Sequence, residues 1–182
     1  FVNTTDYTIY TPDYTPTAPI RDSCAQIHEW MIETAKIPKN VNVILLGHSQ
    51  GGVIATRLAA VKKIQLDYNI LGLVQMNAPL KGSPLIHYLS EERGWFADHH
   101  AFHDLYMDST FIKELQAEAK TIEHIPKIQI GSKFDLHVPL YSCCTSTKNN
   151  IHTINTSHFG GRVIPHVWFN IVFPTIRKWI DH

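Results

Sequence analysis

The chain alternates short apolar runs with longer segments in which apolar side chains recur every three or four residues. The short runs have the length and β-branched content of strands, and they cover residues 7–10, 41–47, 70–78, 127–132 and 152–155. The longer segments, residues 23–35, 50–64 and 165–180, carry the helical repeat; Asp22 or Ser23 is placed to cap the first, and Pro174 is expected to kink the last. This alternation predicts an α/β fold, a mostly parallel sheet flanked by helices, that binds ligands at the carboxyl ends of its strands.

Residues 86–125 interrupt the alternation. Roughly forty residues separate two strands that a short crossover could join, which is long for a connection inside a compact domain. We therefore expect residues 1–182 to form a single domain with an insertion at about residues 86–125.

Composition and charge narrow the classes of function. With 44% apolar and 18% charged residues, the chain can bury an ordinary core, which excludes disorder as its main state. Sixteen basic residues balance sixteen acidic ones, so neither nucleic acid nor an anionic membrane surface is expected as a partner. The longest apolar runs, residues 43–46 and 70–74, are too short to span a bilayer. Three cysteines are too few for a disulfide framework and favour a reducing, cytoplasmic compartment.

The strongest chemical signal is a G-x-S-x-G pattern formed by Gly47, Ser49 and Gly51 within the run Gly-His-Ser-Gln-Gly-Gly. An apolar strand leads into it and an amphipathic helix leaves it, which is the setting of a sharp turn that lifts a serine oxygen above a sheet. Side chains at Gly47 and Gly51 are expected to collide across such a turn. The alternative is a glycine-rich turn in which the serine merely caps the helix.

The residues of this turn resemble those of the α/β-hydrolases, and within that superfamily the lipase- and carboxylesterase-like members. Residues 77–84, 104–115 and 135–139 are similar to lipase segments that follow in the same order. The resemblance implies an α/β-hydrolase-like sheet with its first strands missing and a helical lid at residues 86–125. The apolar side chains of this insertion would line an acyl-chain pocket, pack it onto the sheet, or both: Trp95, Phe96, Phe102, Leu105, Tyr106, Met107, Phe111, Ile112 and Leu115.

A nucleophilic serine needs a neighbouring base, and the base needs an orienting acid. In the α/β-hydrolase order, the acid and then the histidine follow the serine, each just after a strand. Asp135 follows residues 127–132 and His158 follows residues 152–155, so Ser49, Asp135 and His158 form the expected triad. The rivals are His137 for the base and Asp108 for the acid. His48, beside the serine, is either a pocket wall or a participant.

The oxyanion of an acyl-transfer transition state needs at least two converging donors. The backbone N–H of Gln50, the residue after the nucleophile, is expected to be one. The second normally comes from a loop after an earlier strand, and no such strand and loop precede Tyr7. We therefore expect an upstream segment of the same protein to supply it.

These features predict a serine hydrolase that cleaves carboxylic esters, with a small acyl ester or lipid as substrate. An acyltransferase or thioesterase using the same triad is an alternative, as is a non-catalytic acyl-binding module with an incomplete oxyanion site. No cofactor and no metal is expected. His99 and His103 would share a helix face and invite a metal-site interpretation, but a solvated polar face is the alternative and no distant third ligand can be named.

Overall fold

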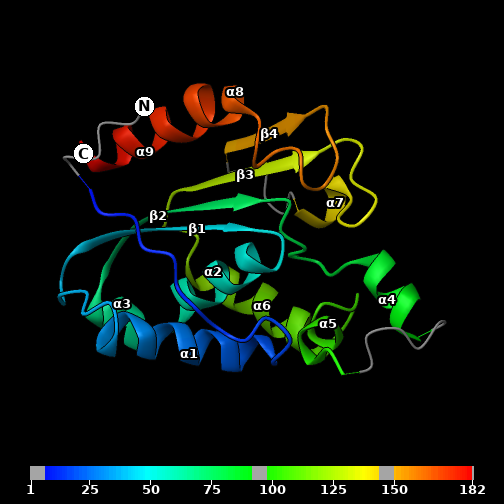
Figure 1. Cartoon of the computed structure of the whole chain (residues 1–182), viewed down its shortest axis with the longest axis horizontal. Coiled ribbons are helices and arrows are strands. Elements are labelled where there is room, and N and C mark those ends of the chain that lie inside the picture. Colours follow the sequence, from blue (N-terminus) through cyan, green and yellow to red (C-terminus); the bar gives the residue numbers. More distant parts are fainter. Residues whose placement is uncertain (1–6, 92–97, 144–149, 182) are drawn as a thin grey trace.

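The computed structural model describes residues 7–91, 98–143 and 150–181. Its centre is a parallel sheet with strand order β1-β2-β3-β4 (Figure 1), built from β1 (Asn42–His48), β2 (Asn69–Met76), β3 (Lys127–Ser132) and β4 (Asn150–Ile154). Leu45 lies opposite Leu73, Val74 opposite Ile128, and Ile130 opposite His152. Because all the strands run the same way, their carboxyl ends meet at one edge of the sheet.

One face of the sheet is covered by α1 (Ile20–Glu33), α2 (Gln50–Ala60), α3 (Lys62–Asp67) and α6 (Thr110–Thr121) (Figure 1). The main core lies between these helices and includes Ile27 of α1, Ile54 and Leu58 of α2 and Leu115 of α6. An ion pair between Arg57 and Glu118 joins α2 to α6. The first turn of α1 has a cap from a distant segment, because the Ile20 N–H donates to the Asp104 carboxylate (2.7 Å).

The opposite face packs on a C-terminal helical segment made of α8 (Pro165–Val167), the π-helical turn η1 (Trp168–Val172) and α9 (Phe173–Ile180). Val74, Met76, Ile128 and Ile130 meet Val167 and Val172 in this second core. A kink was expected at Pro174, and the structure has a π-helical turn just before this proline. A proline cannot donate a backbone hydrogen bond and its ring crowds the preceding turn, so a widened turn accommodates it.

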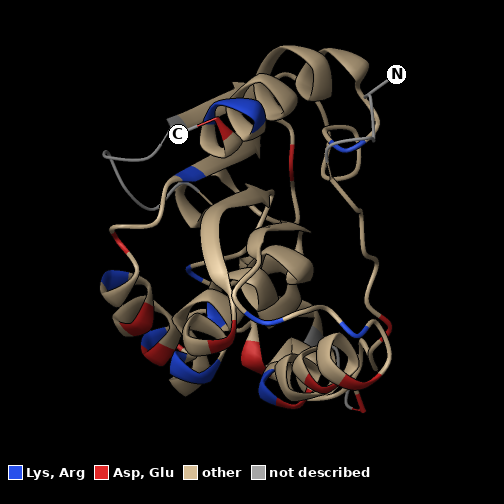
Figure 2. Cartoon of the chain, turned by 90° about the vertical axis from the view of Figure 1, so that its left-hand side faces the viewer, with Lys and Arg blue, Asp and Glu red and all other residues tan. Residues whose placement is uncertain are grey.

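The insertion contains α4 (Pro84–Glu91), α5 (His100–Asp104) and α6, while α7 (Leu140–Cys143) follows the loop after β3. None of the helices in the described part of the chain has the length and apolarity needed to cross a membrane. Figure 2 shows basic and acidic residues interspersed along the helices rather than separated by sign.

The predicted elements and the structure differ at three points. Residues 7–10 form no strand, because they pair with no other described strand. The helix predicted over residues 50–64 breaks at Val61, whose backbone is extended (φ −70°, ψ 114°) and which is the N-cap of α3. Neither Asp22 nor Ser23 caps α1, which begins three residues earlier than Ser23, at Ile20.

A chain of buried polar side chains crosses from the sheet to α2. Gln129 of β3 donates to Gln75 of β2 (3.0 Å), and Gln75 donates to Thr56 of α2 (2.6 Å). Thr56 in turn donates to the carbonyl of Gly52 at the start of α2 (2.8 Å). These hydrogen bonds satisfy groups that would be costly to bury alone, and they fix α2 against the strands.

Candidate active site

Ser49 lies on a sharp turn between β1 and α2. Its backbone dihedrals, φ 55° and ψ −127°, are unusual for a residue with a side chain, and such strain persists only where the surroundings enforce it. The Ser49 N–H donates to the Met76 carbonyl (2.8 Å), so the turn is anchored to the end of β2. The next residue, Gln50, already begins α2.

The glycines of this turn have different roles. A Cβ added at Gly47 would overlap the backbone of Gly51 and Gly52, as expected from the sequence. The corresponding expectation for Gly51 is wrong: apart from its chain neighbours and the backbone of its own helix, a Cβ there would have no heavy atom within 4 Å. Gly52 provides the second close approach instead, since its Cβ would lie 2.5 Å from the Ala78 Cβ.

Three side chains from separate segments form one hydrogen-bonded chain above the carboxyl ends of the strands. His158 Nε2 lies 2.9 Å from Ser49 Oγ, and His158 Nδ1 lies 2.7 Å from Asp135 Oδ2. The structure therefore brings together Ser49, His158 and Asp135. Because the carboxylate accepts from Nδ1–H, the Nε2 lone pair faces the serine hydroxyl.

Asp135 is buried, and its carboxylate is surrounded by donors. Oδ1 accepts the backbone N–H groups of His137 and Val138 (both 2.9 Å), and Oδ2 also accepts from Asn77 Nδ2 (2.6 Å). Burial alone would raise the pKa of Asp135. The hydrogen bonds from His158, Val138 and Asn77 outweigh burial and lower that pKa, so the carboxylate stays ionised at neutral pH.

Asn77 is a site residue to which the sequence analysis assigned no role. It is fully buried, has a φ of 47°, and directly follows β2. Its amide nitrogen donates to Asp135, while its amide oxygen accepts from Ser132 Oγ (3.2 Å). An asparagine tolerates a positive φ better than most residues. The lipase-like stretch of residues 77–84, which begins with Asn77, is the sequence signal that could have found it.

His48 contacts the loop that carries His158. His48 Nε2–H donates to the His158 carbonyl (2.8 Å), and the two rings are 4.9 Å apart at their centroids. Burial lowers the pKa of His48, although the hydrogen bond to His158 opposes this shift. A neutral His48 therefore ties the end of β1 to the His158 loop, without a hydrogen bond to the serine in this network.

The rival residues occupy other positions. His137 is half exposed, with its ring centroid 5.0 Å from that of His158, and its Nδ1 lies 3.9 Å from Asp135 Oδ1. Asp108 is exposed in the turn before α6. Of the two aspartates, Asp135 is therefore the one that contacts His158.

Gln50 is the first residue of α2, so its N–H lies at the positive end of the helix dipole, beside Ser49. Its side chain turns away and donates to the Pro16 carbonyl (3.0 Å). The side chain of Gln50 is therefore engaged in a hydrogen bond, and its backbone N–H lies in the first turn of α2.

The insertion packs closely against the rest of the chain. Leu105, Phe111, Ile112 and Leu115 are buried in the main core, which favours a packing role for these side chains. Trp95 and Phe96 lie outside the described residues. His99 directly precedes the short α5 and His103 lies in its last turn, and within the described segments no third ligand gathers around them.

Comparison with solved structures agrees with the fold. In a crystal structure of a Bacillus licheniformis lipase in mature form, 76% of the chain aligns with 91% of the present one (TM-score 0.65, 15% identity). A putative hydrolase from Agrobacterium vitis S4 aligns over 74% of its length and 92% of this chain (TM-score 0.60, 19% identity). A carboxylesterase structure from the thaumarchaeon Nitrososphaera gargenis aligns over 75% of its own length and 92% of this chain (TM-score 0.60, 12% identity).

The parallel sheet, the serine turn and these neighbours define the chain as an α/β-hydrolase fold. Residues 18–176 match the PGAP1-like alpha/beta domain family, and the chain belongs to that family. No curated protein sequence matches it.

Proposed function

We propose that the protein is a serine hydrolase that cleaves carboxylic esters, with Ser49 as nucleophile, His158 as general base and acid, and Asp135 as the orienting acid. The observation that carries this proposal is the hydrogen-bonded chain from Asp135 through His158 to Ser49, with distances of 2.7 and 2.9 Å. The separations match those required of a nucleophile, its base and the group that orients the base.

In this mechanism, Ser49 Oγ attacks the ester carbonyl while its proton passes to His158 Nε2. The tetrahedral oxyanion accepts the Gln50 N–H, and His158 returns the proton to the departing alcohol as the acyl-enzyme forms. A water molecule then attacks the acyl group, with His158 again accepting and returning the proton, and the acid leaves. Throughout, Asp135 keeps Nδ1 protonated and stabilises the transient imidazolium.

Apolar side chains around the triad favour an acyl or lipid ester over a highly charged substrate. Leu136, next to Asp135, is 82% exposed, and Phe159, next to His158, is 53% exposed. The Phe159 ring lies 4.9 Å from the His158 ring. An exposed apolar ring against His158, with an exposed leucine in the neighbouring loop, suits a substrate that has an ester at one end and a hydrocarbon chain at the other.

The test of this proposal is covalent labelling together with turnover. A fluorophosphonate should label the wild-type protein at Ser49, and Ser49→Ala should lose both labelling and p-nitrophenyl ester hydrolysis at nearly unchanged thermal stability. Ser157→Ala, at an exposed serine beside His158, is the matched control and should keep both the labelling and the ester hydrolysis. Absence of labelling in the wild type would instead favour a non-catalytic acyl-binding module.

The identity of the acid is tested separately. Asp135→Asn should reduce turnover by up to about 10⁴-fold, because the amide favours the wrong imidazole tautomer. Asp108→Asn is the control, since asparagine also accepts the positive φ of 64° at that position. If Asp108→Asn shows the large loss and Asp135→Asn does not, the acid is misassigned.

Two further features belong to the same proposal. Besides packing on the main core, the insertion at residues 86–125 is proposed as a lid because of its resemblance to lipases, and an upstream segment is proposed to supply the second oxyanion donor. The upstream segment is supported by the edge of the sheet, because β1 pairs only with β2 among the described strands and its Leu46 is 45% exposed. Transfer of the acyl group to an acceptor other than water would use the same residues, and product analysis with added alcohol or thiol distinguishes it from hydrolysis.

A further inference from the structure

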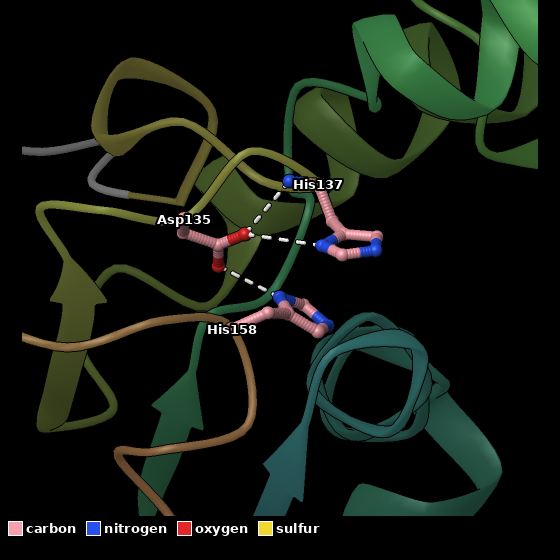
Figure 3. A group of neighbouring side chains, drawn as sticks. All are labelled: Asp135, His137 and His158. Carbon is pink, nitrogen blue, oxygen red and sulfur yellow. Dashed lines mark hydrogen bonds and ion pairs between the residues drawn. The ribbon is translucent and has the colours of Figure 1, made fainter.

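His137 lies beside Asp135 and His158 of the proposed triad, and together these three residues could bind a metal ion. Asp135, His137 and His158 each offer a ligand atom, and these atoms all lie within 4.8 Å of one another. Figure 3 shows both imidazole rings on the same side of the carboxylate, each with a ring nitrogen toward it. His137 plays no part in the proposed proton transfers, and its half-exposed ring gives the group access to solvent.

The ligand set indicates which ion this group would take. Two imidazole nitrogens and one carboxylate oxygen match three-ligand zinc sites, in which water completes the coordination. Mg²⁺ and Ca²⁺ prefer oxygen ligands and would be bound poorly. Zinc bonds of about 2.0–2.2 Å at tetrahedral angles require ligand atoms roughly 3.4 Å apart.

The observed separations bracket that requirement. His158 Nδ1 lies 2.7 Å from one carboxylate oxygen and His137 Nδ1 lies 3.9 Å from the other. Zinc would take one carboxylate oxygen, so the His158–Asp135 separation must open by about 0.7 Å, and those separations among the three ligand atoms, all within 4.8 Å, that exceed roughly 3.4 Å must close. Rotation of the half-exposed His137 ring supplies the second change, and the first replaces the hydrogen bond between His158 and Asp135.

We propose that Asp135, His137 and His158 form an inhibitory zinc site that switches the His158 tautomer. In the metal-free protein, His158 carries its proton on Nδ1 and presents the Nε2 lone pair to Ser49. Zinc bound at Nδ1 requires that lone pair, so the single proton of the neutral ring moves to Nε2 through solvent, and no net proton is gained or lost. His158 Nε2–H then faces Ser49 as a donor and can no longer accept the serine proton.

Binding of the metal and inhibition are separable claims, and only inhibition rests on the proposed hydrolase function. Isothermal titration of the protein with zinc chloride in a non-chelating buffer should give one bound ion. His137→Ala, which keeps the backbone N–H donated to Asp135, should weaken zinc binding at least tenfold. His124→Ala, at an exposed histidine away from this group, is the matched control and should bind zinc like the wild type. Magnesium chloride should give no binding.

Saturating zinc should slow fluorophosphonate labelling of Ser49 at least tenfold, and EDTA should restore it. In His137→Ala, zinc at the same concentration should change the labelling rate less than threefold relative to that variant's own zinc-free rate. Equal zinc affinity in wild type and His137→Ala, or no binding up to 1 mM, would overturn the site, and bound zinc without slower labelling would overturn the tautomer switch. A failure of labelling in zinc-free wild type would instead reject the hydrolase function, while leaving the titration to judge the metal site.

Discussion

Asn77 shows how much of the site depends on a single side chain that does no chemistry. Its amide connects Ser132, at the end of β3, to the Asp135 carboxylate, which in turn holds His158. Gly161, three residues after His158, packs close to the same amide, since a Cβ added there would lie 3.4 Å from the Asn77 amide oxygen. Asn77 is therefore a positioning residue for the acid of the proposed triad.

Asn77→Gly should lower kcat about tenfold or more with little change in KM, because one hydrogen bond to a charged group contributes about 1.5–3 kcal/mol. Glycine accepts the positive φ, so the variant removes the amide without adding backbone strain. Steady-state kinetics and thermal denaturation measure the two effects. Asn77→Ala, which adds the strain, should lose more stability than Asn77→Gly; equal kcat in wild type and Asn77→Gly would refute the positioning role.

The sequence could predict the residues that have a motif or a fixed chain order, but not those defined only by contacts. The two glycines around Ser49 and the alternation of strands led to Ser49, Asp135 and His158. The hydrogen bonds made by Asn77 and by the His48 ring join segments more than 50 residues apart, and no local pattern encodes them. The misjudged Gly51 has a similar cause, because the direction of its Cβ depends on how α2 leaves the turn.

At the scale of elements, Gly47 and Gly51 in the turn between β1 and α2 differ in the space available for a side chain. Gly47→Ala should destabilise the protein by at least the roughly 1–3 kcal/mol typical of overpacking, because the new methyl group meets backbone that cannot move aside. Gly51→Ala should be neutral or stabilising by up to about 1 kcal/mol, since alanine favours the helix and finds open space. Denaturant titration compares the two variants; a Gly51→Ala protein as unstable as Gly47→Ala would contradict this geometry.

The elements that were predicted well are those whose signal is local. The apolar runs of β1, β2 and β3 lie within a residue or two of their predicted bounds. Residues 7–10 have a strand-like composition, but a strand also needs a neighbour to pair with, and the sequence does not reveal which neighbours are present. The start of α1 was placed too late because its cap, Asp104, comes from a segment 84 residues away.

An ion pair joins the segment before β1 to the end of α3, and it gives a pH-dependent stability. The hydrogen bond from Lys39 Nζ to Asp67 Oδ1 (2.7 Å), supported by His28, lowers the pKa of Asp67. A carboxyl group whose pKa is lower in the folded state contributes stability above its unfolded pKa of about 3.9. That contribution is lost as the pH falls through the lower folded value.

Asp67→Asn should therefore be less stable than wild type at pH 6, and the difference should shrink as the pH falls from about 4 toward 2. Thermal denaturation across this range measures it. Asp181→Asn, at an exposed aspartate that ends α9, is the control and should follow the wild-type curve. A constant difference between wild type and Asp67→Asn at all pH values would show that the ionised pair contributes nothing specific.

At the scale of the whole molecule, the apolar pattern of β1 and its place in the described sheet differ. The continuous apolar run of β1 predicts a strand buried on both faces with a neighbour on each side. In the described chain β1 is an edge strand, and Val43, Ile44 and Leu45 are only partly buried. β2 and β3, which have two neighbours each, are buried along most of their length.

The exposed apolar edge of β1 leads to the last prediction, that a further strand from an upstream segment pairs with it in the native protein. Because the loop after that strand would provide the second oxyanion donor, residues 1–182 alone should hydrolyse p-nitrophenyl esters about 10²–10³-fold more slowly than the native protein. Intact mass and N-terminal sequencing of native material identify the segment, and steady-state kinetics of both forms measure its effect. Comparable Ser49 labelling stoichiometry in both forms is the control that each is folded. If residues 1–182 alone match the native rate, the second donor must come from within them, and the β1 edge has no part in catalysis.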